Sequence, residues 1–164
     1  MSDHLLYQIA LTLVPQVGAM TAKNLVSYCG SAEGVFKASR RELLKIPGIG
    51  TVVTDSVLAA STLHIAEREM EFLENNRVNA VFYTDEKYPS RLKQCPDSPV
   101  MLFFKGSSVQ LLNSERIVAI VGTRQPSDYG KAVCEEMVEA LKPDNPLIIS
   151  GLAYGVDITA HRQS

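Results

Sequence analysis

The sequence IVAIVGTRQPSDYG, residues 117–130, decides the fold of this chain. It opens with a β-prone run of five apolar residues, and Gly122 ends that run. A second stretch of the same kind, LIISGLAYGVD at residues 147–157, follows a segment with helical periodicity at 128–142. Continuous apolar strands that alternate with helices are typical of a parallel sheet covered on both faces. We therefore expect an α/β domain in which each strand leads into a glycine-containing loop.

Two more short apolar runs, at residues 80–83 and 100–104, precede this stretch. A short helical segment is expected near residues 89–95, between them. In the residues further upstream the spacing of apolar side chains is different. They recur at helical spacing, with Gly and Pro between the segments, which predicts helices. The last of these helices is expected over about 52–75.

The change of period at residue 76 predicts two domains. Residues 1–76 form a small all-α domain, and residues 77–164 form an α/β domain with a mainly parallel sheet. The expected fold class is therefore α+β, with a helical domain followed by a Rossmann-like domain.

The helical domain contains a weak internal repeat. VPQVG at residues 14–18 and IPGIG at residues 46–50 lie 32 residues apart. Two copies of one helix–turn–helix unit account for this spacing. Ser39, followed three residues later by Glu42, predicts a capped helix start just before the second copy.

The second copy resembles the helix-hairpin-helix element of non-specific DNA-binding proteins. Its glycines permit a tight turn, and the helix that follows begins with backbone amides that can hold a phosphate. This turn and the cations upstream of it form a candidate secondary DNA contact: Gly48, Ile49, Gly50, Arg40, Arg41 and Lys45. The alternative is that the repeat is a compact helical module whose glycines serve turn geometry only.

Composition limits the classes of function. The 164 residues include 16 Lys and Arg against 18 Asp and Glu, so a bulk basic surface for nucleic acid is absent. The 3 cysteines are far apart, and they indicate neither a disulfide framework nor a metal site. No apolar run has the length of a membrane span. We expect a cytoplasmic protein without metal or cofactor, and any polyanion binding must come from local geometry.

Local geometry of that kind is predicted at the two strand–loop–helix junctions. If the two strands are neighbours, both loops open at one edge of the sheet, where ligands of open parallel sheets bind. Glycine allows close backbone approach, hydroxyls donate hydrogen bonds, and a guanidinium grips phosphate with two N–H groups. The candidate residues are Gly122, Thr123, Arg124, Ser127, Ser150, Gly151 and Gly155.

Neither loop matches GxGxxG or a Walker A loop. Asp157 and His161 are four residues apart on the second helix, so they share a face and could perform acid–base chemistry. No nucleophile accompanies them in the pattern, and we favour a structural role for both. No catalytic residue is assigned.

Together these segments resemble DNA-processing protein A, the DprA/Smf family of bacterial transformation proteins. The resemblance rests on VAIVGTR at residues 118–124, on Ser127 with Tyr129 and Gly130, and on SGLAYGVD at residues 150–157. Ala160-His161, Tyr88-Pro89 and the segment PVML at 99–102 also fit.

The resemblance implies a Rossmann-like domain that binds single-stranded DNA and has no catalytic step. It also implies protection of incoming DNA and loading of the recombinase RecA onto it, during natural transformation, by a homodimer. Residues Gly122 to Arg124 would line the DNA pocket beside Ser150 and Gly151, with Arg124 as its main cation. Because members of this family continue past residue 164, the chain is expected to be an N-terminal portion with an incomplete α/β domain.

Two other functions remain open. One is a Rossmann-like nucleotide phosphoribohydrolase of the lysine-decarboxylase-like kind, which has a similar glycine-and-arginine loop but needs a PGGxGTxxE stretch absent from these residues. The other is an accessory module of a repair nuclease, in which the helical hairpin binds DNA and the α/β part is a scaffold.

Overall fold

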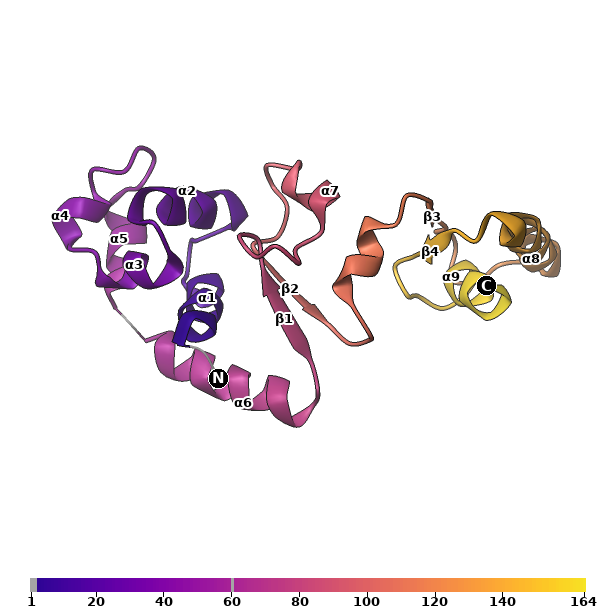
Figure 1. Ribbon diagram of the computed structural model, residues 1–164, viewed down its shortest axis with the longest axis horizontal. Coiled ribbons are helices and arrows are strands. Elements are labelled where there is room, and N and C mark those ends of the chain that lie inside the picture. The colour runs from indigo at the N-terminus through magenta and orange to yellow at the C-terminus, as the bar shows by residue number, and fades with distance from the viewer. Residues whose placement is uncertain (1–2, 60) are drawn as a thin grey trace. The chain divides into compact units, whose positions relative to one another are not determined.

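The computed structural model describes residues 3–59 and 61–164 and divides the chain into two compact units (Figure 1). Unit 1 runs through Val109, and unit 2 runs from Gln110 to Ser164. Each unit has its own cluster of buried hydrophobic residues. Among the helices of the described residues, none combines the length and the apolarity needed to cross a bilayer.

Unit 1 begins with short helices whose apolar faces meet. Their bounds are α1 Asp3–Leu13, α2 Ala19–Cys29, α3 Ala32–Lys37, α4 Arg40–Leu43, α5 Thr51–Leu58 and α6 Leu63–Asn75. The capping box predicted before α4 is confirmed: the Ser39 amide donates to the Glu42 carboxylate at 2.8 Å, and the Glu42 amide donates to the Ser39 hydroxyl at 3.3 Å. The Ser39 hydroxyl also donates to the Glu42 carboxylate at 2.7 Å, and this hydrogen bond, followed by the one from the Ser39 amide, lowers the pKa of Glu42.

The turns before α2 and α5 share one backbone structure, as the repeat predicts. In each copy the amide of the fourth residue donates to the carbonyl of the first, at 3.2 Å in one copy and 3.1 Å in the other. Gln16 has a φ of +66° where its counterpart Gly48 has +79°. Gln16 therefore adopts the left-handed conformation that glycine takes without steric cost. The Asn24 side-chain amide ties the copies together by donating to the Pro47 carbonyl at 2.7 Å.

The single helix expected over 52–75 is wrong, because the structure has two helices there, α5 and α6. Residue 60 lies outside the described residues. α5 packs against α3 and α4, whereas α6 packs against α1. The apolar stripe that predicted one long helix belongs to α6 from Leu63 onward, and α5 buries a different face through Thr54 and Val57.

Unit 1 ends in an antiparallel pair of strands, β1 Asn79–Phe82 and β2 Met101–Phe104. The register pairs Asn79 with Phe104 and Phe82 with Met101. The connection between the strands contains the short helix α7, Ser90–Lys93. These strands form a sheet of their own rather than extending a parallel one.

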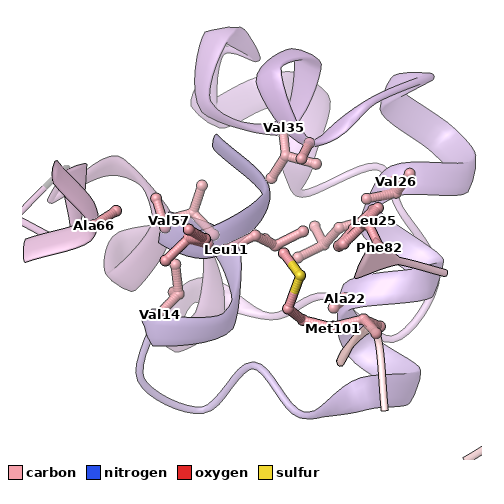
Figure 2. Packing of buried hydrophobic residues seen from close by; sticks show 14 of the residues in the cluster. Leu11, Val14, Ala22, Leu25, Val26, Val35, Val57, Ala66, Phe82 and Met101 are labelled. Carbon is pink, nitrogen blue, oxygen red and sulfur yellow. The ribbon is translucent and has the colours of Figure 1, made fainter. Parts of the chain in front are cut away.

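The strand pair packs on the helices. Figure 2 shows Phe82 and Met101 among helical side chains such as Leu25, and all three belong to one buried cluster. Lys23 on α2 holds the connection between the strands, because its ammonium donates to the Pro96 carbonyl at 2.8 Å and to the Ser98 hydroxyl at 2.9 Å. Lys23 therefore has a structural role in unit 1.

Unit 2 is a small α/β unit. Its elements are η1 Val109–Asn113 (which starts at the end of unit 1), β3 Ile117–Ala119, α8 Asp128–Leu141, η2 Lys142–Asp144, β4 Leu147–Ile149 and α9 Val156–Gln163. β3 and β4 pair in parallel, and α8 packs against α9. Cys134, Val138 and Ala160 form the buried centre between the helices and the strands. The helix predicted at 128–142 and the parallel pairing of these strands are confirmed.

The fold class expected from the sequence is confirmed: an all-α helical region is followed by an α/β region that contains a parallel strand pair. The expected domain boundary between residues 76 and 77 stays a prediction. The compact unit that contains the helices includes β1 and β2 and extends to Val109.

Candidate nucleic-acid interface

The two strands of unit 2 bring their following loops to one edge of the sheet. Ile117 pairs with Leu147 and Ala119 with Ile149 in a parallel register. The Ile120 amide donates to the Ile149 carbonyl at 2.9 Å, which extends the pairing one residue further. The first junction loop, residues 120–127, and the second junction loop, residues 150–155, therefore leave the sheet side by side, as expected from the sequence.

The junction loops contact each other through their glycines. The Val156 amide donates to the Thr123 carbonyl oxygen at 3.1 Å. Gly155 has a φ of +88°, and a Cβ built on it would lie 2.2 Å from the same carbonyl oxygen. A Cβ on Gly122 would lie 2.7 Å from Cγ2 of Val156. Gly122 and Gly155 therefore serve the packing of the loops on one another, beyond the ligand approach for which the sequence proposed them.

The second junction loop is held by two residues of α9. The Ser150 hydroxyl lies 2.8 Å from Nε2 of His161 and accepts a hydrogen bond of 3.0 Å from the Leu152 amide. The carboxylate of Asp157, which is 3% exposed, accepts from the Ala153 amide at 3.3 Å. A Cβ on Gly151 would also lie 3.3 Å from Oδ2 of Asp157. Asp157 and His161 thus support the loop, as the structural interpretation of the pair predicts.

The contact between Ser150 and His161 was missed by sequence reasoning, which found no hydroxyl beside the histidine. Eleven residues separate the two positions, and only the return of α9 along the strand brings them together. When Nε2 of His161 carries the proton, the Ser150 oxygen accepts two hydrogen bonds and its own proton is available to a ligand.

The hydroxyls of the first junction loop make local hydrogen bonds. The Thr123 hydroxyl accepts from the Gln125 amide at 3.2 Å, which closes a short turn. The Ser127 hydroxyl accepts from the Gly130 amide at 3.2 Å and caps the N-terminus of α8. Both oxygens therefore act as acceptors within the loop, and each O–H remains a donor.

Arg124 is exposed, and within the described residues its guanidinium makes no hydrogen bond or ion pair. It lines a hollow of about 450 Å³ between α8 and α9, which we call the α8–α9 hollow. Gly155 lines the same hollow, whereas Ser150 and Gly151 do not. The structure therefore groups Arg124 with residues of α8 and α9, and it groups Ser150 and Gly151 with His161 and Asp157.

Two tyrosines flank the junction loops. Tyr154 is 83% exposed in the second loop, and Tyr129 is 80% exposed just after the first. Rings so exposed contribute little to a core, but each offers an apolar face to a planar ligand. Tyr154 and the α9 cation Arg162 were not among the residues singled out as candidate contacts.

In unit 1 some residues of the candidate secondary DNA contact form the turn before α5, and one of its cations, Arg40, is held in an ion pair. Gly50 precedes α5 with no side-chain cap, so the first amides of this helix have no side-chain acceptor at the cap. Ile49 is buried, which fixes the turn. Arg40 forms an ion pair with Asp55 on α5, and this hydrogen bond raises the pKa of Arg40.

The remaining cations of this group lie on the surface of unit 1. Lys45 lines a hollow of about 500 Å³ with Tyr28 and Lys37, and Arg41 is exposed. Within the described residues, no group of three or more His, Cys, Asp or Glu side chains is placed to hold a metal ion.

Both regions of the chain match models of known protein families. The model of DNA recombination-mediator protein A matches residues 79–164, and the model of the helix-hairpin-helix motif matches residues 8–81. The DNA processing protein DprA of Bacillus subtilis is 32% identical over 136 residues, 79% of this chain and 46% of that protein. Protein Smf of Synechocystis is 30% identical over 160 residues, 94% of this chain and 39% of that protein.

A solved structure agrees with the fold. The X-ray structure of DNA processing protein A from Streptococcus pneumoniae superposes with a TM-score of 0.69 at 23% identity, over 99% of this chain and 53% of that chain. This chain spans less than half of the length of the two curated relatives.

Proposed function

Because the chain belongs to the family of DNA recombination-mediator protein A, we propose that the complete protein binds single-stranded DNA at the two junction loops of unit 2. In this proposal Gly122, Thr123 and Arg124 hold the strand together with Ser150 and Gly151. The contacts are mainly to phosphate, so they do not read sequence.

The observation that carries the proposal is the joining of the two loops. The hydrogen bond from the Val156 amide to the Thr123 carbonyl and the close packing of Gly155 on the same carbonyl fix both loops at one edge. Loops at the carboxyl ends of neighbouring parallel strands are where open α/β sheets bind ligands. A strand laid across this edge would meet both loops at once.

The side chains at this edge suit a nucleic-acid strand. Arg124 has no protein partner within the described residues, so its guanidinium is available to a phosphate. Tyr154 and Tyr129 are almost fully exposed, and exposed aromatic rings stack on bases of any sequence. Phosphate binding with base stacking is the usual combination for single strands.

The helical hairpin is a secondary contact in this proposal. The uncapped amides at the start of α5 can donate hydrogen bonds to a phosphate, with Gly48, Ile49 and Gly50 setting the turn. Arg41 and Lys45 add charge, and Arg40 adds charge when it leaves Asp55. The hairpin is a separate contact within unit 1, and it does not replace the junction loops of unit 2.

The wider role is also a proposal. We propose that the complete protein acts in the cytoplasm without catalysis or a cofactor, protects incoming single-stranded DNA during natural transformation, and helps to load RecA onto it. A homodimer would present two such edges to one strand. Membership of the family supports these roles, and the chain spans less than half of the length of the two curated relatives.

A fluorescence-anisotropy titration of the complete protein with a labelled dT20 strand tests the proposal. We expect binding that weakens as salt rises, because phosphate contacts release counterions. Arg124→Ala should weaken binding at least fivefold. Binding that is absent, or that is unchanged by Arg124→Ala, would contradict the proposal. Release of free base from a nucleoside monophosphate would instead favour the phosphoribohydrolase.

A further inference from the structure

The α8–α9 hollow contains more positive charge than the junction loops alone. Four of its lining residues belong to the junction loops: Arg124, Gln125, Pro126 and Gly155. The others are Lys131 and Glu135 on α8, and Ile158, Thr159, Arg162 and Gln163 on α9. At about 450 Å³ the hollow is large enough for a nucleotide-sized group.

Three of the lining residues are cations and only Glu135 is an acid. Lys131 is partly neutralised by Asp128 at 3.3 Å, but within the described residues the guanidinium of Arg162, like that of Arg124, makes no hydrogen bond or ion pair. The whole chain has a net charge of −2, so the positive field of the hollow is local. Both arginines line the same hollow, so an anion bound there would be attracted by two positive charges.

The fold holds Arg162 in this place. Ile158 and Arg162 are four residues apart on α9, so they share the face that borders the hollow. The start of α9 is fixed to Thr123 by the Val156 amide, one residue before Arg124. Residues 124 and 162 are far apart in the sequence. The hydrogen bond between the Val156 amide and the Thr123 carbonyl links the two segments that contain them, and it therefore helps to fix the positions of both arginines.

We infer that Arg162 is a second phosphate-binding cation, and that the strand held at the junction loops continues into the α8–α9 hollow, where its phosphodiester group lies between Arg124 and Arg162. This inference rests on the proposed function. It adds a DNA contact on α9. It also gives the DNA strand a direction, because the sugar–phosphate backbone would pass between α8 and α9.

The test compares Arg162→Ala with Arg124→Ala and with the control Arg116→Ala in the complete protein. Arg116 is also an exposed arginine of unit 2, but it pairs with Asp144 at 3.1 Å and precedes β3, whereas Arg124 follows it. The measurement is anisotropy with labelled dT20 over a range of salt. We expect Arg162→Ala to weaken binding three- to tenfold and to reduce the slope of log K against log salt by about 0.7, the value for one phosphate contact of a single strand. Arg116→Ala should change neither quantity.

A second variant separates charge from packing. Arg162→Lys keeps the positive charge and should retain most of the slope of log K against log salt. Arg162→Gln removes the charge and should reduce the slope as Arg162→Ala does. If Arg124→Ala weakens binding and Arg162→Ala behaves like Arg116→Ala, the inference is wrong and the proposed function stands. If the unmodified protein does not bind dT20, the proposed function itself fails.

A competition with dTMP distinguishes the source of the phosphate. We expect dTMP to displace dT20 only at concentrations far above the dissociation constant of the strand, because a strand contacts both junction loops and the hollow. Displacement by dTMP at concentrations equal to that constant would overturn the inference and point to a mononucleotide site.

Discussion

Gly155 lies against Thr123 so closely that a single methyl group would separate the two junction loops. A Cβ at residue 155 would lie 2.2 Å from the Thr123 carbonyl oxygen and 2.6 Å from the carbonyl carbon of Arg124. The same carbonyl oxygen of Thr123 accepts the Val156 amide. One glycine therefore fixes the geometry of the edge at which we propose that DNA binds.

Gly155→Ala should strongly destabilise unit 2. The substitution adds left-handed backbone strain to a clash with backbone atoms, about 3 kcal/mol or more in the free energy of unfolding. Gly30→Ala is the control, because Gly30 has a similar φ of +83° with no atom near its Cβ position. Its cost should be the backbone strain alone, about 1 kcal/mol. Urea unfolding measures both, and equal losses would contradict the close packing of the loops.

Tyr154→Ala should weaken the contacts with DNA bases and leave the contacts with the sugar–phosphate backbone of the DNA unchanged. Base stacking on an aromatic ring contributes about 1–3 kcal/mol per base, so affinity for dT20 should fall about tenfold or more. Affinity for an abasic strand of the same length should not change. Phe72→Ala is the control, because Phe72 is also exposed, at 56%, on α6 of the helical unit. A loss of equal size on the abasic strand would show that Tyr154 acts through the loop and not by stacking.

Asp55→Asn tests whether the helical hairpin contacts DNA. The change leaves Arg40 without its ion-pair partner and removes an acid from α5. If the hairpin is a secondary contact, affinity for dT20 at low salt should rise two- to threefold, roughly, because one more cation is near the strand. Asp144→Asn is the matched control, since it removes the carboxylate that pairs with Arg116, although Arg116 keeps its hydrogen bond to the Asp144 carbonyl at 2.9 Å. An equal rise in both variants would indicate a general charge effect and would contradict the hairpin contact.

The three cysteines should react with iodoacetamide in an order set by burial. Cys95 is exposed, Cys29 is half-buried and Cys134 is buried. Burial, with the nearby carboxylate of Glu42 or Glu135, raises the pKa of Cys29 and Cys134, so less of each thiol is thiolate at a given pH. We expect Cys95 to be modified first and Cys134 last at pH 8, with the two slower rates increasing as the pH rises toward their pKa. Peptide mass spectrometry measures the order, and early modification of Cys134 would show that unit 2 opens readily.

Much of the fold was predictable because local rules act within short segments. The capping box at Ser39 and Glu42 and the strand at residues 147–149 are encoded by adjacent residues. The turn at Gln16 was recognised only through its counterpart at Gly48, since glutamine by itself does not signal a positive φ. The break between α5 and α6 was missed because apolar residues continue through it at helical spacing, and tertiary packing decides which of them share a face.

The candidate site was predictable only in part. Gly122 and Gly155 were found because glycine after a strand indicates an unusual backbone requirement, although the requirement proved to include packing of one loop on the other. Arg162 and the contact of Ser150 with His161 depend on how α9 returns along the sheet. No pattern in a single sequence records that direction.

The most direct test of the central claim is an amide-resolved NMR titration of the complete protein with unlabelled dT20. If DNA binds at the junction loops, we expect the largest chemical-shift changes on amides of residues 122–127 and 150–155. Smaller changes should occur at the start of α5. Changes confined to the hairpin turn at residues 46–51, with the junction loops unaffected, would contradict the claim.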